Sequence, residues 1–235
     1  MIASTGMAIR YSVIIPAYNE ARSIGRAIAE TRNAFLGFGE SFEIIVVDDG
    51  SSDATANIVR GTDVRLIRHE KNQGKGAAVR TGVAAAQGDI FLFLDADLAT
   101  HPSEFEKCIS LFAMNDIVIG SRRAVGSAIV QKQPWHRVAL GRTFNTIIQR
   151  YLGLPFEDTQ CGFKAFASSA KPIFAELATS GWVFDVEVLG QAMKRGMRIA
   201  EVPVAWKNGA DSRVKLNHSW KILQELRAVR RRLRD

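Results

Sequence analysis

The stretch IFLFLDAD, residues 90–97, runs from five apolar residues directly into two carboxylates, Asp95 and Asp97. An unbroken apolar run of this kind is typical of a strand that is buried on both faces of a parallel sheet. In open parallel sheets, ligands bind at the carboxyl ends of the strands. The two acids are therefore expected either to bind a divalent cation there or to cap the turn into the next helix.

Similar apolar runs alternate with helical patterns along the chain. After the first run, apolar residues recur at helical spacing. The segments after the later runs contain glycines or begin with Ser and Asp, which suit the start of a helix. The alternation predicts an α/β fold, a mostly parallel sheet with helices on both faces, in a single domain over residues 1–215. The other predicted strands include residues 11–16, 42–49, 64–69 and 116–122.

The second half of the sequence is less regular. Residues 101–112 (HPSEFEKCISLF) predict one helix, because Pro102 suits a first helical turn. Residues 122–135 (RRAVGSAIVQKQPW) predict a polar loop of functional length. Residues 216–235 predict a basic amphipathic helix attached to the domain.

Composition limits the classes of protein to consider. The chain has 235 residues, 47% of them hydrophobic, which is enough to bury a sizeable core. No apolar run reaches the length of a membrane span, and the first residues do not have the pattern of a signal peptide. Two separated cysteines, Cys108 and Cys161, fit a reducing compartment. We therefore expect a cytoplasmic protein.

The net charge of +7 is concentrated at the C-terminal end. From Lys194 onward there are 12 basic and 4 acidic residues. Such a segment is compatible with nucleic acid, with an anionic membrane surface, or with simple solvation. We expect no nucleic-acid partner, because few aromatic residues accompany the arginines and no nucleic-acid-binding motif is present.

Seven short motifs occur in order between Tyr11 and Trp206: IIPAYNE, VVDDGSSD, NQGKGAAVRTG, DADLAT, GSR, DTQCGFK and WVFDVE. Together they resemble the family 2 glycosyltransferases of the GT-A fold. Within that family, DADLAT, DTQCGFK and FDVE are similar to the polyprenyl-phosphate sugar transferases, particularly the dolichyl-phosphate β-glucosyltransferases. The resemblance implies transfer of a sugar from a nucleotide donor, and it covers nearly the whole chain.

The resemblance assigns the donor-binding residues. Asp95 and Asp97 would hold Mg²⁺ or Mn²⁺ and, through it, the sugar diphosphate. Lys75 lies between two glycines at the start of a predicted helix, where amide groups and a cation favour phosphate; a solvated surface lysine is the alternative. The residues expected to bind the nucleotide sugar are Pro16, Tyr18, Glu20, Asp48, Asp49, Lys75, Asp95 and Arg213.

One position departs from the mannosyl members of the family, which often have Gln two residues after the second acid. Here that position is Ala99. The difference favours a glucosyl over a mannosyl donor and leaves a metal ion with fewer protein ligands.

No histidine or carboxylate stands out as a general base for an alcohol acceptor. A phosphate monoester needs none, because it is already largely ionised at neutral pH. Arginines bind such anions well. The resemblance picks out Arg122 and Arg137 as ligands of the acceptor phosphate, and it implies that Asp158 and Gln160 contact sugar hydroxyls or the reacting centre. Asp185 and Glu187 would orient these loops or form structural salt bridges.

The expected activity is inverting, metal-dependent transfer of glucose from UDP-glucose to a polyprenyl phosphate. The alternatives are a GDP-mannose-dependent polyprenyl-phosphate mannosyltransferase and a family 2 transferase with a soluble acceptor. The C-terminal helix would place the protein peripherally at the cytoplasmic face of a membrane, where a membrane-anchor protein is a candidate partner; the alternative is that the helix packs on the domain.

Overall fold

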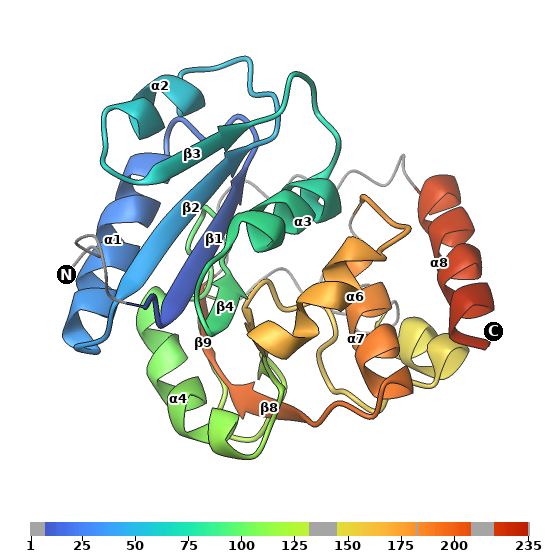
Figure 1. Ribbon diagram of the computed structural model, residues 1–235. Helices are drawn as coiled ribbons and strands as arrows, with labels where there is room; N and C mark the ends of the chain where they lie inside the picture. Colours follow the sequence, from blue (N-terminus) through green and yellow to red (C-terminus); the bar gives the residue numbers. More distant parts are fainter. Residues whose placement is uncertain (1–7, 132–144, 182, 208–218, 235) are drawn as a thin grey trace.

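The structure, a computed structural model, describes residues 8–131, 145–181, 183–207 and 219–234 (Figure 1). Its central sheet has seven strands in the order β3-β2-β1-β4-β7-β5-β8. All neighbouring strands pair in parallel except those beside β7. The predicted α/β fold with a mostly parallel sheet is therefore confirmed. The strands are β1 (Tyr11–Ala17), β2 (Phe42–Asp48), β3 (Arg65–Arg68), β4 (Ile90–Phe93), β5 (Ile117–Ser121), β7 (Lys164–Ala167) and β8 (Ile199–Pro203).

Helices cover both faces of the sheet because successive residues of each strand point to opposite sides. In β1, Val13 and Ile15 belong to one buried cluster and Ile14 to the other. The first cluster includes residues of α1 (Ile24–Gly37), α2 (Thr55–Arg60) and α4 (Glu106–Ile109). The second cluster involves α3 (Lys75–Ala85), α6 (Lys171–Ala175), α7 (Phe184–Lys194), α8 (Ser219–Arg234) and a helix over residues 145–152.

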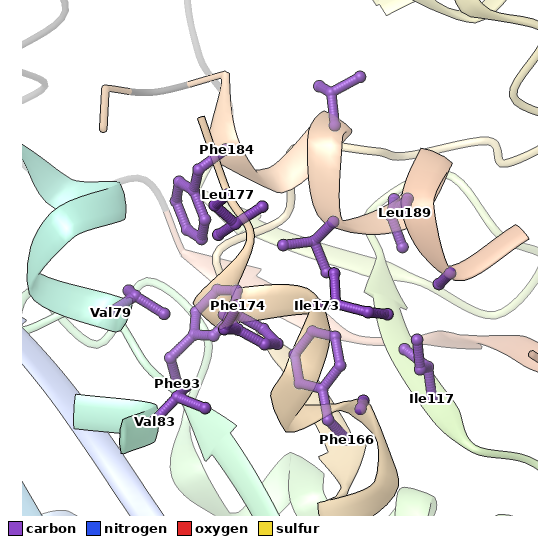
Figure 2. Packing of buried hydrophobic residues seen from close by; sticks show 14 of the residues in the cluster. Val79, Val83, Phe93, Ile117, Phe166, Ile173, Phe174, Leu177, Phe184 and Leu189 are labelled. Carbon is purple, nitrogen blue, oxygen red and sulfur yellow. The ribbon is translucent and has the colours of Figure 1, made fainter. Parts of the chain in front are cut away.

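Phenylalanine side chains pack together among the aliphatic residues of the second cluster (Figure 2). Phe166 of β7 stacks on Phe91 of β4 with ring centroids 5.2 Å apart. The rings of Phe166 and Phe174 of α6 are perpendicular, with their centroids 5.0 Å apart. The contacts fix α6 and α7 against the middle of the sheet, beside Val79 and Val83 of α3.

Strand β7 runs antiparallel between β4 and β5, with Phe91 opposite Phe166 and Val118 opposite Ala165. Because its direction is reversed, β7 begins at the edge where its neighbours end. The preceding DTQCG turn, residues 158–162, consequently lies at the carboxyl edge of the parallel strands.

The helix expected over residues 101–112 is present as a helical segment over residues 102–113, in which an α-helical turn (α4) lies between the 3₁₀ turns Pro102–Phe105 and Ser110–Ala113. One expectation about local structure was wrong. The expected polar loop contains strand β6 (Ala128–Gln131), which pairs in parallel with β9 (Ala205–Lys207). Polar neighbours on both sides concealed this short β-branched run in the sequence.

The two cysteines are buried and unpaired: Cys108 lies in α4 and Cys161 in the turn before β7. Neither forms a disulfide, as the separation of the two residues in the sequence suggested.

Candidate functional site

The turn that follows β4 presents the two acids at the carboxyl edge of the sheet. The Leu98 amide donates to the Asp95 carbonyl at 3.0 Å, and the Ala99 amide donates to Asp97 Oδ1 at 2.9 Å. Leu98 has φ 55°, in the left-handed region that costs a residue with a side chain about 1–3 kcal/mol. The turn is thus fixed by hydrogen bonds despite an unfavourable backbone conformation.

Lys75, the first residue of α3, reaches the same place. Its Nζ lies 2.6 Å from Asp95 Oδ1, and its side chain is only 13% exposed. Burial alone would lower the pKa of Lys75, but the negative charges of Asp95, Asp185 and Asp97 outweigh burial and raise it. Partial burial and the charge of Asp95 raise the pKa of Asp97. A buried cation therefore borders the two carboxylates.

Gly162 allows the DTQCG turn to lie directly against Asp95. A Cβ atom at this glycine would be 1.9 Å from Asp95 Oδ2 and 2.7 Å from its Cγ. Any larger residue would displace the carboxylate or the turn. The glycine in the CGF motif is therefore explained by close packing around Asp95.

Arg122 follows β5 and pairs with Asp158 in a fork. Its Nε and Nη2 donate to Oδ2 and Oδ1 at 2.6 and 2.9 Å, and its backbone amide donates to Oδ2 at 3.1 Å. Burial would raise the pKa of Asp158, but its hydrogen bonds and ion pair with Arg122 lower it overall. The guanidinium also lies 5.5 Å from the ring centre of Trp206.

This pairing differs from the separate roles expected for the two residues. Asp158 is buried and both its oxygens accept from Arg122, so it holds the arginine in place. Direct contact of Asp158 with a sugar stays a prediction. Burial would lower the pKa of Arg122, but its hydrogen bond and ion pair with Asp158 raise it overall, with a smaller contribution from the negative charge of Asp95.

Asp48 and Asp49 lie in the interior at the end of β2. Asp48 accepts from the Ser51 amide at 3.1 Å and has Arg68 Nε 2.9 Å from its other oxygen. Asp49 accepts from the amides of residues 73 and 74 at 2.9 and 2.8 Å and contacts His69 Nδ1 at 2.7 Å. Both acids shape the loops at this edge, including the one that leads to Lys75; contact with a nucleotide stays a prediction.

The residues expected at the end of β1 are partly accessible. Pro16 and Glu20 are of intermediate exposure and Tyr18 is 41% exposed. Between them, Asn19 has φ 54° and accepts through Oδ1 from the Ser52 amide at 2.8 Å. Asn19 thereby joins the loops after β1 and β2. Sequence reasoning missed it, although Asn is the residue that tolerates this backbone region best after glycine.

Three expected residues complete the set. Gln160 lies in the DTQCG turn, where its amide donates to Asp158 Oδ1 at 3.3 Å. Arg137 and Arg213 lie outside the described residues. Their roles stay predictions.

Asp95 and Asp97 could supply two ligands to a divalent cation, fewer than it needs. In the ranges that the structure covers, no cluster of three or more His, Cys, Asp or Glu side chains has the arrangement of a metal site. Asp95 is of intermediate exposure with Oδ1 paired to Lys75, and Asp97 is exposed, so the two carboxylates offer hard oxygen ligands that solvent can reach. A Mg²⁺ or Mn²⁺ ion held here would complete its coordination with donor oxygens and water.

The two acids of the FDVE motif point to different partners. Asp185 Oδ1 accepts from Lys164 Nζ at 2.7 Å, and Lys164 is completely buried. Glu187, also completely buried, accepts from the amides of Ala178 and Thr179 at 2.9 and 2.8 Å. Both acids thus form structural ion pairs, Asp185 with Lys164 and Glu187 with Arg232. That they orient the loops of Arg122 and the DTQCG turn stays a prediction.

The C-terminal helix packs on the domain, as the second of the two expectations for it proposed. Leu226 and Val229 of α8 are 4% and 1% exposed and belong to the second core cluster. Leu233 lies against α7, where Gly190 leaves room for it. The described part of the apolar stripe is thus used within the protein. Among the described residues, no helix is long and apolar enough to cross a membrane.

Comparison with known proteins agrees with this geometry. Residues 12–171 match the model of the family described as Glycosyl transferase family 2. The chain is 38% identical over 230 residues to a dolichyl-phosphate beta-glucosyltransferase of Trichomonas vaginalis, covering 91% of this chain and 68% of that protein. A protein of the same name from Saccharomyces cerevisiae is 35% identical, with coverage of 87% and 69%. The corresponding Dictyostelium discoideum protein is 38% identical, with coverage of 84% and 66%. The chain thus spans about two thirds of the length of these relatives.

Solved structures share the fold. Glucosyl-3-phosphoglycerate synthase from Mycobacterium tuberculosis, crystallised with Mn²⁺, UDP and phosphoglyceric acid, superimposes with a TM-score of 0.70 at 22% identity. The match covers 94% of this chain and 77% of that one. At this identity the likeness supports the fold alone.

Replacing Gly162 with Ala tests the packing around Asp95. The added methyl group would displace the carboxylate or the turn, so we expect a loss of about 1–3 kcal/mol of unfolding free energy. Gly37→Ala is the control, because a Cβ there meets nothing within 4 Å. Chemical denaturation measures the effect; a Gly162→Ala variant as stable as the unmodified chain would contradict the close packing.

Replacing Arg122 with Gln tests the ion pair. Because the folded-state pKa of Asp158 lies below its unfolded value, the pair stabilises the fold above about pH 4 and this contribution is lost as the pH falls through the folded pKa. We expect a loss of roughly 3 kcal/mol near neutral pH that shrinks toward acid pH. Denaturation curves across that range measure it. Adding Asp158→Asn to the variant should recover part of the loss; a loss independent of pH would count against the pair.

Proposed function

The chain belongs to glycosyl transferase family 2, and from this membership we propose that it transfers glucose from UDP-glucose to the phosphate of a polyprenyl lipid. That it is a glycosyltransferase follows from the family and from its relatives. Glucose and the lipid acceptor are supported by the shared name of those relatives, dolichyl-phosphate beta-glucosyltransferase. Ala99 agrees with a glucosyl donor through the resemblance described above.

The observation that carries the choice of acceptor is the Arg122–Asp158 pair. An alcohol acceptor needs a group that takes its proton, and a carboxylate with a lowered pKa that is engaged on both oxygens is a poor base. Of the two histidines in the described ranges, His69 is tied to Asp49 and Thr81, and His101 contacts Glu30 and Ser103. A phosphate acceptor removes the need for a base and is itself attracted by Arg122.

The donor would lie over the acids at the carboxyl edge. Asp95 and Asp97 would hold a Mg²⁺ or Mn²⁺ ion, which supplies positive charge to the diphosphate when bound. Lys75 adds a positive charge beside the same oxygens. The loops after β1 and β2, joined by Asn19, would receive the uridine. These residues align the donor and stabilise the charge of the departing UDP.

Arg122 would orient the acceptor phosphate on the opposite side of the sugar from UDP. A phosphate oxygen then forms a bond to the anomeric carbon while the bond from that carbon to the UDP oxygen breaks, so the configuration inverts. An ionised acceptor delivers the electron pair without releasing a proton. The work of the protein is to bring two anions together, and Lys75 and Arg122 would supply positive charge for it.

The basic C-terminal helix would bring the protein to the membrane that carries the acceptor. Its apolar face packs on α7, so contact would rest on charge and not on insertion. Arg231 and Arg234 are exposed on α8. We place this contact at the cytoplasmic face, where anionic lipids attract basic segments; a membrane-anchor protein as partner remains part of the proposal.

A transfer assay tests the activity. The purified chain is mixed with Mg²⁺ or Mn²⁺, a short polyprenyl phosphate, and radiolabelled UDP-glucose or GDP-mannose in parallel. We expect label in the lipid phase from UDP-glucose alone. Asp97→Asn should lower the rate by about 100-fold or more, and Glu106→Gln, an exposed acid on α4, should not. Label from GDP-mannose alone would refute the glucosyl assignment, and label from neither would point to a soluble acceptor.

Flotation with vesicles tests the membrane contact. We expect binding to anionic vesicles at low salt, because each basic residue near the surface contributes about 1 kcal/mol, and release at high salt through screening. The double variant Arg231→Gln, Arg234→Gln should bind about 30-fold more weakly. Neutral phosphatidylcholine vesicles are the control. Equal binding to both kinds of vesicle would contradict a charge-based contact.

A further inference from the structure

A short irregular segment, residues 177–180, links α6 to α7 and is held by a buried carboxylate. Glu187 Oε2 accepts from both the amide and the hydroxyl of Thr179, at 2.8 and 2.7 Å, and Oε1 accepts from the Ala178 amide at 2.9 Å. Three hydrogen bonds from two successive residues fix the path of the backbone. The segment is therefore as rigid as the helix that carries Glu187.

The end of this segment, residues 180–181, packs against the first turn of α3. The Ser180 carbonyl accepts from the Ala77 amide at 3.3 Å. A Cβ at Gly74 would lie 2.4 Å from that carbonyl oxygen, and one at Gly76 would lie 3.1 Å from the Gly181 carbonyl oxygen. Gly74 and Gly76 flank Lys75. A shift of residues 180–181 would therefore move the backbone that carries Lys75.

Helix α8 supplies the charge that balances Glu187. Arg232 Nη1 lies 3.1 Å from Glu187 Oε1 and donates to the Glu176 carbonyl at 2.7 Å. One arginine thus binds both the buried carboxylate and the start of the linking segment. Glu225 of α8 also lies close to the segment, since a Cβ at Gly181 would be 2.9 Å from its Oε1. Residues of the C-terminal helix therefore contact the segment directly.

Core packing also connects the linking segment to α3. Leu177, at the start of the segment, and Phe184, at the start of α7, point into the cluster shared with Val79 of α3 (Figure 2). Arg80 of α3 donates to the Leu177 carbonyl at 3.2 Å. Movement of the segment would therefore be transmitted to α3 and not absorbed between them.

We infer that Arg232 is a positioning residue for the donor site: through Glu187 and residues 176–181 it sets the place of Lys75 against Asp95. The inference rests on the proposed function, because it assigns Lys75 to the donor diphosphate. Arg232 contacts no substrate in this scheme. It makes donor affinity depend on how α8 is docked, which is a coupling between two distant parts of the chain.

Coupling of this kind is reciprocal. If docking of α8 strengthens binding of the nucleoside diphosphate, then the nucleotide must stabilise the docking of α8 by the same factor. The unmodified chain therefore provides a test that needs no substitution and no turnover.

The first experiment compares Arg232→Gln with Arg198→Gln, an exposed arginine outside α8. UDP with Mn²⁺ is titrated calorimetrically, and thermal unfolding is recorded for each variant. We expect Arg232→Gln to bind UDP about fivefold more weakly, within the range of such couplings, and Arg198→Gln to match the unmodified chain. Arg232→Lys, which keeps the charge, should fall between them. In transfer assays the KM for the donor should rise while kcat stays nearly constant.

The second experiment measures hydrogen exchange of the unmodified chain with and without UDP. Slower exchange in residues 225–233 on adding UDP supports the coupling; unchanged exchange there overturns it, whether or not the variants fold. A folded Arg232→Gln variant with unchanged UDP affinity also overturns it. If the unmodified chain binds neither UDP nor GDP, the proposed function fails, and the inference fails with it.

Discussion

The contact between Lys75 and Asp95 is the interaction on which the arrangement of the site depends. A buried ammonium group and a carboxylate 2.6 Å apart must come from elements that are held firmly, since either charge alone would be costly to bury. The lysine is fixed by the docking of α3, and the carboxylate by the strained turn at Leu98. Gly162 lies directly against the Asp95 carboxylate, where a side chain would not fit. Three segments distant in the sequence are thereby fitted around one carboxylate.

Much of the architecture was predictable because burial leaves a local pattern. Strands β1, β2, β4 and β5 lie between two helical layers, so nearly every residue in them is apolar and the runs are visible in the sequence. The acids after β4 stood out for the same reason: they end such a run. Strand β6 left no such pattern, since it belongs to a separate two-stranded sheet and has polar neighbours.

The site was predictable in composition but not in pairing. The sequence indicated Arg122 and Asp158 as two independent ligands, and the structure makes them one ion pair. Their separation of thirty-six positions is set by the reversal of β7, which no local pattern announces. The partnership of Arg232 with Glu187 depends in the same way on how α8 docks. Long-range pairing of charges is decided by topology, and residue type alone does not specify it.

Both native thiols are closed to reagents. Burial, as the main cause, raises the pKa of Cys108 to about 12 and that of Cys161 to about 11, so each stays a neutral thiol at neutral pH. Since these are the only cysteines in the sequence, a cysteine introduced on the surface would be the single reactive position of the folded protein. Fluorescent or spin labels can therefore be attached at chosen points without first removing the native residues. The fold thus offers an unmodified background for spectroscopy.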